Sequence, residues 1–186
     1  MEPETVLSVW KQAAEPALRR AGQALAELTG LPFALEDQWV GLLPWNQFVA
    51  ELAAEHPVPL YVVTLSAQGL FKAQIWLVFT ETNGRDLVAA MVGTPPPHPL
   101  DALGQSALAE VGNVVGTAFL NVFADRFSTA WEPSPPTVHY VARGWLEEQT
   151  AGDALVLITD ARFQVTGTRV KGELVVLPTP LSDRSP

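Results

Sequence analysis

The sequence predicts an α+β domain in which two long helices pack beside a mostly antiparallel sheet. Helix-like segments and strand-length apolar runs occur twice along the chain, each time in the order helix, strand, paired strands. The segment TPPPHP at residues 94–99 separates the two series, because consecutive prolines fit neither a helix interior nor a central strand. We therefore expect one duplicated domain with a pseudo-two-fold axis and pseudo-repeats at about residues 15–93 and 100–177.

The first long helix is expected over residues 17–29. Pro16 would occupy its first turn and Gly30 would lie just past its end, where these residue types are usual at helix termini. Residues 5–14 are also helix-like. Because proline has no backbone N–H to donate, we expect Pro16 to kink or separate the two helical pieces.

Strand-like runs follow in the first half, bounded by turn residues. They lie near residues 39–43, 60–65 and 70–79, and Ala67, Gln68 and Gly69 are expected to join the last two as a hairpin. The stretch GRDLVAAMVG, residues 84–93, then indicates a short helix.

The second half begins with a long helix that carries the segment SALAEVGNVVGTAFLN, residues 106–121. Asp101 is expected to cap the N-terminus of this helix, which should run to about Arg126. Further strands are expected near residues 137–141, 155–158, 163–166 and 173–177, followed by an unstructured tail over residues 178–186.

The two halves align without large gaps when Glu15 is placed on Glu110. The segment LYVVTL then falls on LVLITD, and GLFKAQIWLVF falls on GTRVKGELVVL. Several elements keep nearly the same offset, which favours an internal duplication at weak sequence identity.

Composition excludes several classes of function. The net charge is -9 and only 11 of 186 residues are Lys or Arg, which argues against nucleic acid as the main partner, because phosphate neutralisation needs clustered basic residues. The chain has no cysteine, so we expect neither a disulfide framework nor thiolate chemistry. The acidic start MEPETV lacks the basic region of a signal peptide, and no uncharged apolar run approaches about 18 residues. We expect a cytoplasmic protein without membrane insertion.

Common catalytic devices are also missing from the sequence. His56, His98 and His139 lie in unrelated segments without the spacing of metal ligands, so no metal site is expected. The segment GQSAL around Ser106 departs from the G-x-S-x-G pattern at its last position. No glycine-rich phosphate-binding loop is present either.

A thin polar line runs along the otherwise apolar second long helix. At roughly 100° per residue, Glu110, Asn113, Thr117 and Asn121 fall on one strip. The other side is expected to be covered by Leu108, Val111, Val115, Ala118, Phe119, Val122 and Phe123. A helix with this pattern is buried around most of its circumference and exposes one narrow strip.

Two glycines accompany the polar strip. Gly112 and Gly116 each cost about 1 kcal/mol relative to alanine in a helix interior, so their presence indicates close approach of another backbone. We expect the neighbour to be the first long helix, which would hold the polar strip rigidly.

Three segments carry a resemblance to a known family. SALAEVGNVV, FLNVFADRF and the PSPPTV of residues 133–138 resemble the second half of the CheC/CheX/FliY family of response-regulator phosphatases. With the duplicated element order and the strand pair GLFKAQIWLVF, the resemblance spans most of residues 15–177. It implies two long helices against a six-stranded sheet, a single intact E-x-x-N motif, and removal of phosphate from the aspartate of CheY-like partners.

The resemblance also implies roles for individual residues. The acidic position of the family matches Glu110, which would pair with a lysine of the partner, and the amide position matches Asn113, which would orient a water for in-line attack. Thr117 and Asn121 would line the partner-binding strip. The resemblance implies no cofactor on this chain, because Mg²⁺ and the acyl phosphate belong to the CheY-like response regulator.

Two other readings of the strip remain open. The chain could be a non-catalytic adaptor that binds a receiver domain or a CheD-like deamidase, or the strip could be ordinary solvated surface. An isolated carboxylate and amide at i and i+3 are common on helix surfaces.

The first half departs from the family pattern. Its matching segment reads EPAL, with Leu18 where the amide would be, so we predict no active site there. Glu15 is interpreted as a helix-start residue, and Arg19 and Arg20 as a solvated helix face. The glycine often found four residues after the family's asparagine is replaced by Thr117.

Overall fold

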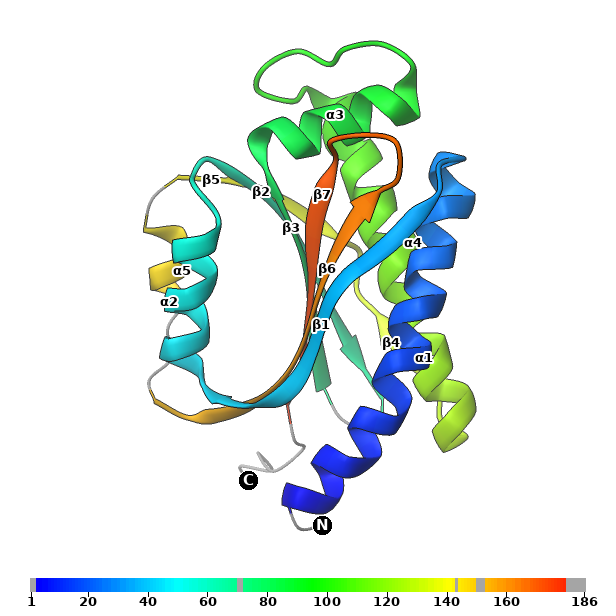
Figure 1. Cartoon of the computed structure of the whole chain (residues 1–186), viewed down its shortest axis with the longest axis vertical. Coiled ribbons are helices and arrows are strands. Elements are labelled where there is room, and N and C mark those ends of the chain that lie inside the picture. Colours follow the sequence, from blue (N-terminus) through cyan, green and yellow to red (C-terminus); the bar gives the residue numbers. More distant parts are fainter. Residues whose placement is uncertain (1–2, 70–71, 143, 150–152, 180–186) are drawn as a thin grey trace.

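The computed structural model describes residues 3–69, 72–142, 144–149 and 153–179 (Figure 1). These residues form one antiparallel sheet with strand order β1-β6-β7-β3-β2-β4, and β5 also pairs with β2. The strands are β1 Phe33–Pro44, β2 Leu60–Gln68, β3 Lys72–Thr80, β4 Glu132–Pro133, β5 Thr137–Val141, β6 Leu155–Val165 and β7 Lys171–Thr179. The α+β class is confirmed. The sheet of this described part has seven strands instead of six, and the two-residue β4 is the addition.

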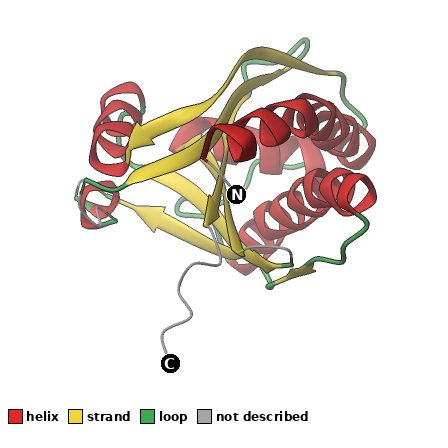
Figure 2. Ribbon diagram, turned by 90° about the horizontal axis from the view of Figure 1, so that it is seen from below, coloured by secondary structure: helices red, strands yellow, loops and turns green. Residues whose placement is uncertain are grey.

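Helices cover both faces of the sheet. The long helices α1 (Pro3–Thr29) and α4 (Ala102–Phe127) lie side by side on one face, while α2 (Trp45–Glu55) and α5 (Trp145–Glu148) lie on the other (Figures 1 and 2). The remaining helix of the described residues, α3 (Glu81–Val92), follows β3 and contacts α4.

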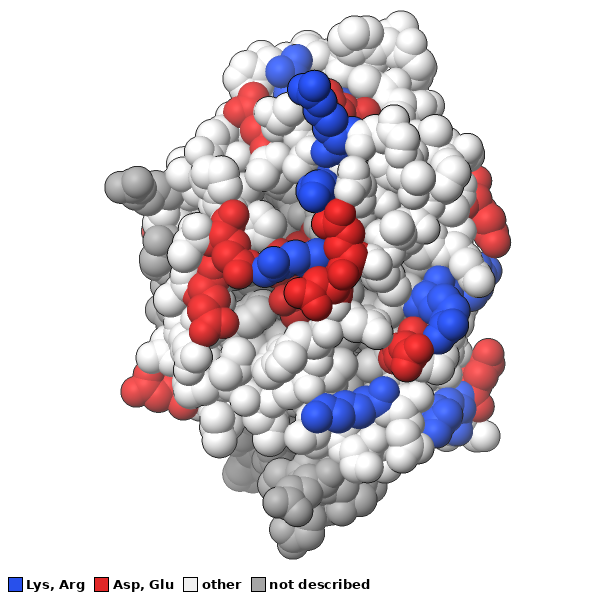
Figure 3. Space-filling model, in the orientation of Figure 1, with Lys and Arg blue, Asp and Glu red and all other residues white. Residues whose placement is uncertain are grey.

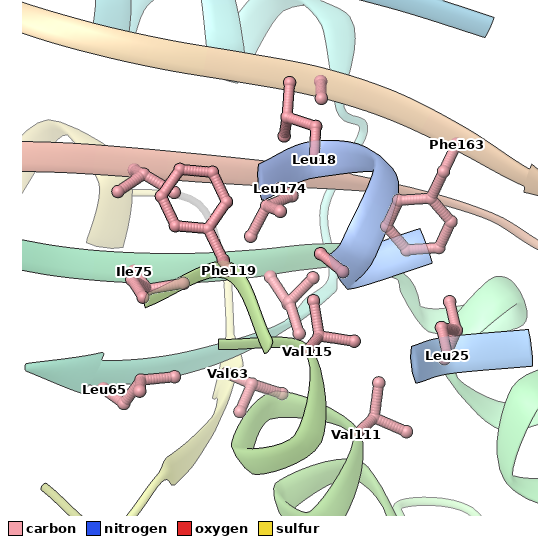
Figure 4. Close-up of a cluster of buried hydrophobic side chains, with 14 of the residues drawn as sticks. Leu18, Leu25, Val63, Leu65, Ile75, Val111, Val115, Phe119, Phe163 and Leu174 are labelled. Atoms are coloured by element: carbon pink, nitrogen blue, oxygen red, sulfur yellow. The ribbon is translucent and has the colours of Figure 1, made fainter. Parts of the chain in front are cut away.

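A separate apolar core fills the space on each face. Under the long helices, Val111, Val115 and Phe119 of α4 and Leu18 and Leu25 of α1 meet apolar side chains from the sheet (Figure 4). The sheet side chains drawn there are Val63, Leu65, Ile75, Phe163 and Leu174. The second core lies under α2 and α5 and includes Phe48, Leu52, Trp76, Leu146 and Val175. Burial on both faces explains why the central strands read as nearly continuous apolar runs.

The first helix passes through its internal proline. Of the two expectations for Pro16, separation into two helices is wrong, because α1 is one helix from Pro3 to Thr29, and the kink stays a prediction. Ala13 and Ala14 before the proline, and Ala17 and Leu18 after it, are all buried in the same core, so packing on both sides offsets the lost backbone hydrogen bond. The helix end is as predicted, since Gly30 has the left-handed φ of 69°.

The second long helix begins and ends close to its predicted bounds. The Asp101 carboxylate accepts a hydrogen bond from the Gly104 backbone N–H at 2.9 Å, which confirms Asp101 as the N-cap. The helix runs to Phe127, one residue past the predicted end, and Ser128 closes it in the left-handed region. Local sequence rules therefore predicted both the N-cap at Asp101 and the helix that follows it.

Several element predictions need correction. The runs 155–158 and 163–166 belong to one strand, β6, because residues 159–162 between them pair with both neighbouring strands, β1 and β7. The hairpin turn lies later than expected, since β2 continues to Gln68, and residues 70–71 lie outside the described part. β7 includes Pro178 and Thr179, which pair with β3, so the predicted tail is wrong for these two positions, and residues 180–186 lie outside the described part.

Apart from α3 in the first half and the two-residue β4 in the second, the described elements follow the order helix, strand, helix, strand, strand in both halves. The halves also exchange strands: β1 of the first half pairs with β6 of the second, and β5 of the second half pairs with β2 of the first. The pair β3 and β7 joins them in the middle of the sheet. The boundaries given for the pseudo-repeats and for the linker at 94–99 stay a prediction.

Candidate functional site

The predicted polar strip lies on the solvent side of α4. Glu110, Asn113 and Asn121 are exposed, and Thr117 between them is half-buried. On the opposite side of the helix, Leu108, Val111, Val115, Ala118, Phe119 and Phe123 are buried, and Val122 is half-buried. The structure therefore places the carboxylate and the amide together on the exposed side of α4, one helical turn apart.

The two glycines pack α4 onto the sheet. A Cβ atom at Gly112 would lie 2.5 Å from Cγ1 of Val63, and one at Gly116 would lie 3.0 Å from the Leu65 methyls. Both neighbours are side chains of β2, so the expectation that these glycines face the first long helix is wrong. The close contact still fixes the depth and the rotation of α4, because a side chain at either position would lift the helix off the sheet.

Within the part of the chain that the structure describes, Glu110 and Asn113 are not engaged by other side chains. Among the described residues, the side chains of Glu110 and Asn113 make no hydrogen bond and no ion pair. Glu110 is also the only charged residue between Asp101 and Asp125 in the sequence. An exposed carboxylate without an internal partner can accept a cation from another molecule, and a free amide can both donate and accept hydrogen bonds.

The α1 positions that correspond to Glu110 and Asn113 of α4 differ by one residue from those that the sequence alignment gave. Leu18 was placed on Asn113, but Leu18 is buried, whereas Asn113 is exposed. Shifting the alignment by one residue places Gly22 on Gly116 and matches buried positions along both helices. The matched buried pairs are Ala14 with Leu108, Ala17 with Val111, Leu18 with Gly112, Ala21 with Val115 and Leu25 with Phe119.

In this register Pro16 and Arg19 occupy the positions of Glu110 and Asn113, and both are exposed. The first half thus still lacks the carboxylate and amide pair. The interpretation of Glu15 as a helix-start residue is wrong, because α1 begins at Pro3. Glu15 instead accepts a hydrogen bond from Arg19 at 2.7 Å on the exposed face of the helix.

A second polar cluster, which the sequence analysis missed, lies on the other side of the sheet. A hollow of about 430 Å³ opens where α2 ends beside β6 and β7, and acidic and basic side chains gather around it (Figure 3). Inside, Glu173 of β7 is almost fully buried, and it contacts His56, which follows α2. Arg162 of β6 pairs with Glu55, and its Nε lies 3.9 Å from Glu173.

Burial and hydrogen bonding together move the pKa values of two acids in this cluster in opposite directions. Burial, and then the nearby Glu173, raises the pKa of Asp160 to about 8, so Asp160 holds a proton at neutral pH. Burial opposes ionisation of Glu173 too, but hydrogen bonds from His56 and Asp160 outweigh it and lower the pKa of Glu173. The cluster is internally compensated, and its geometry ties the end of α2 to the sheet.

By length and composition alone, α4 could span a membrane. Its most apolar window of 18 residues has a mean hydropathy of 1.4, and half of that window is buried inside the protein. The sequence expectation concerned uncharged apolar runs, and every window of 18 residues in this helix contains Glu110. The buried half packs on α1, β2 and β3, as in the core helix of a domain with helices layered on a sheet.

Comparison with known proteins agrees with this architecture. No family model matches the chain. The chain is 20% identical to the CheY-P phosphatase CheC of Bacillus subtilis over 94% of its own length and 88% of that protein. Among solved structures, FliY of Thermotoga maritima is similar with a TM-score of 0.70 at 14% identity, covering 95% of this chain and 90% of FliY.

A CheX–CheY–BeF3–Mg²⁺ complex from Borrelia burgdorferi is also similar, with a TM-score of 0.63 at 13% identity over 88% of this chain and 95% of the other. The similarity extends over nearly the whole described fold. The resemblance to the CheC/CheX/FliY family, first indicated by the sequence motifs, is therefore confirmed in both sequence and fold.

Proposed function

We propose that this chain hydrolyses the phospho-aspartate of a CheY-like receiver domain, with Glu110 and Asn113 as the working pair. The observation that carries the proposal is that both side chains are exposed, one turn apart, and without a partner in the described part of the chain. The curated relative is named as a CheY-P phosphatase, and one similar structure contains CheY, which supports a receiver as the partner.

In the proposed reaction, Glu110 pairs with a lysine of the receiver and positions α4 across its phosphorylation site. The Asn113 amide then holds a water by hydrogen bonds on the side of phosphorus opposite the aspartate oxygen. The water oxygen forms a bond to phosphorus as the bond from phosphorus to the aspartate oxygen breaks. The products are the aspartate carboxylate and inorganic phosphate, and the water protons leave to the phosphate and the solvent.

Asn113 acts by positioning and not as a base, since an amide is neutral and takes up no proton at pH 7. Fixing a nucleophile in line can supply several kcal/mol of the barrier reduction. The chain itself is proposed to need no cofactor, because the acyl phosphate is already activated and its Mg²⁺ is held by the partner. Thr117 and Asn121 are proposed to line the contact beyond the reacting pair.

The test is a panel of phosphorylated receivers, each timed for phosphate loss with and without this protein. Asn113→Ala should reduce the acceleration at least about 100-fold, because removing one positioned hydrogen-bonding group commonly costs that much. Gln23→Ala is the matched control: it removes an exposed amide from α1 and should leave the rate unchanged.

If no receiver loses phosphate faster and Asn113→Ala changes nothing, the hydrolytic proposal is overturned. Retained binding of a receiver, or of a CheD-like deamidase, would then identify the chain as an adaptor of the same fold. If Glu110→Ala retains both receiver binding and turnover, the strip is ordinary solvated surface.

A further inference from the structure

The solvent side of α4 is nearly free of charge over most of its length. Glu110 is the single ionised side chain among the solvent-accessible residues from 102 to 124. The other accessible residues there are Ala102, Leu103, Gln105, Ser106, Ala107, Ala109, Asn113, Val114, Thr117, Asn121, Val122 and Ala124. Depletion of charged residues is the compositional mark of the centre of a protein interface.

Leu103 stands at the start of this surface. Its side chain is 61% exposed and belongs to neither apolar core. Glu110 follows Leu103 by seven positions, which is about two helical turns, so Leu103 lies on the same line of α4 as Glu110 and Thr117. Isolated exposed leucines are common on protein surfaces, so its position on this line matters more than its exposure.

The first turn of α4 holds Leu103 in a fixed place. The Asp101 carboxylate caps the turn at Gly104, and Gln105 Nε2 donates to the Leu100 carbonyl at 3.0 Å. Leu100 is itself buried, and its backbone N–H donates to the Tyr61 hydroxyl at 3.0 Å. A leucine on such an anchored turn loses little further backbone freedom when a partner covers it.

We propose that Leu103 is an apolar anchor for the receiver domain whose phospho-aspartate is hydrolysed beside Asn113. This inference rests on the proposed function. A carboxylate and an amide alone cover far less than the roughly 800 Å² per partner of a standard interface. Leu103 lies about 15 Å along the helix from Asn113, within the width of one small domain. Glu110 supplies the charged contact, and Leu103 supplies the apolar one.

The two contacts differ in their response to salt, which makes the inference testable. Leu103→Ala should raise KM for a phosphorylated receiver about tenfold and leave kcat unchanged. The substitution removes methyl groups that the receiver would bury, and these groups contribute to binding but not to the chemical step. This tenfold change should persist from low to high salt. The loss of affinity in Glu110→Gln should shrink as salt increases, because the ion pair is screened.

Leu155→Ala is the matched control, since Leu155 is 67% exposed at the start of β6, outside α4. It should change neither KM nor kcat. Urea unfolding of Leu103→Ala should match that of the unsubstituted chain, which separates a lost contact from a lost fold.

The failures are distinguishable. If receivers are dephosphorylated and Leu103→Ala retains the original KM, the anchor is overturned and the phosphatase proposal stands. If receivers bind with an affinity that depends on Leu103 but are not dephosphorylated, the anchor stands and the hydrolytic proposal fails. If Leu103→Ala changes the oligomeric state in sedimentation and leaves receiver binding unaltered, the surface joins copies of this chain and the anchor is overturned.

Discussion

The helices α1 and α4 lie side by side on one face of the sheet (Figure 2). They bury matching positions, yet they expose opposite kinds of surface. α1 exposes five charged residues between 11 and 27: Lys11, Glu15, Arg19, Arg20 and Glu27. Arg19 and Glu15 pair at 2.7 Å, and Arg20 and Glu27 pair at 3.5 Å. α4 exposes one carboxylate over a similar length, and that carboxylate is unpaired among the described residues.

The difference separates two uses of a helix surface. On α1 the charges compensate each other and keep the face hydrated, as on an ordinary surface helix. In the hollow across the sheet, charges are likewise compensated within the chain, by contacts among His56, Glu173, Arg162 and Glu55. Glu110 departs from this pattern, and we infer that its compensation comes from another molecule.

The largest stability effect should follow from disturbing how α4 packs. Gly112→Ala should destabilise the fold by about 2 kcal/mol, because the added Cβ would lie 2.5 Å from Val63 and this overlap exceeds the helix-propensity gain of about 1 kcal/mol. Urea unfolding measures this change. Gly116→Ala, with 3.0 Å to Leu65, should cost less. Equal or higher stability of Gly112→Ala would show that α4 can shift without penalty and would remove the argument for a rigid strip.

A smaller effect is expected from the compensated cluster and depends on pH. The pKa of Asp160 is raised to about 8 in the folded chain, so between pH 4 and pH 8 the folded state binds a proton that the unfolded state lacks. The free energy of unfolding contributed by this group therefore falls as pH rises across that window. Asp160→Asn keeps a hydrogen-bond donor for Glu173 but does not titrate. The free energy of unfolding of this variant, relative to that of the unsubstituted chain, should therefore be higher at pH 8.5 than at pH 5 by about 1 kcal/mol or more.

Urea unfolding at the two pH values measures the Asp160→Asn difference, with Asp125→Asn as the control for an exposed aspartate at the end of α4. The pH dependence contributed by Glu173 has the opposite sign. Because its pKa is lowered in the folded state, Glu173 stabilises the fold at pH values above its unfolded pKa, and this stability is lost as pH falls. A pH-independent difference for Asp160→Asn would contradict the raised pKa of the half-buried Asp160.

The strip on α4 could be predicted because helical periodicity alone defines it. Four polar residues at positions 110, 113, 117 and 121 in an apolar helix can face only one way, and a neighbouring sheet was the expected cover for the rest. The N-cap at Asp101 was equally local. Local rules gave the site its residues, but its roles as catalyst and docking strip came from the family resemblance and stay proposals.

The features that sequence reasoning missed depend on tertiary contacts. A carboxylate in a strand usually faces solvent, so KGELVVL does not reveal that Glu173 is buried and contacts His56, which follows α2. The helix α2 itself follows β1 directly, with Pro44 as the last strand residue, so no turn marked its start. The one-residue error that placed Leu18 on Asn113 was invisible until burial along both helices could be compared.

The smallest effect should come from the charges of α1, and it tests the comparison most directly. Arg19→Ala removes the ion pair with Glu15, whose side chains are 65% and 62% exposed, and exposed pairs at i and i+4 contribute only about 0.3–0.5 kcal/mol. The free energy of unfolding should therefore change by no more than this amount, and the rate of dephosphorylation of a receiver should not change. Because Arg19 is the counterpart of Asn113 in the burial register, a loss of turnover in Arg19→Ala would show that the partner contacts both helices. The functional asymmetry between α1 and α4 would then be wrong even though their surface chemistry differs.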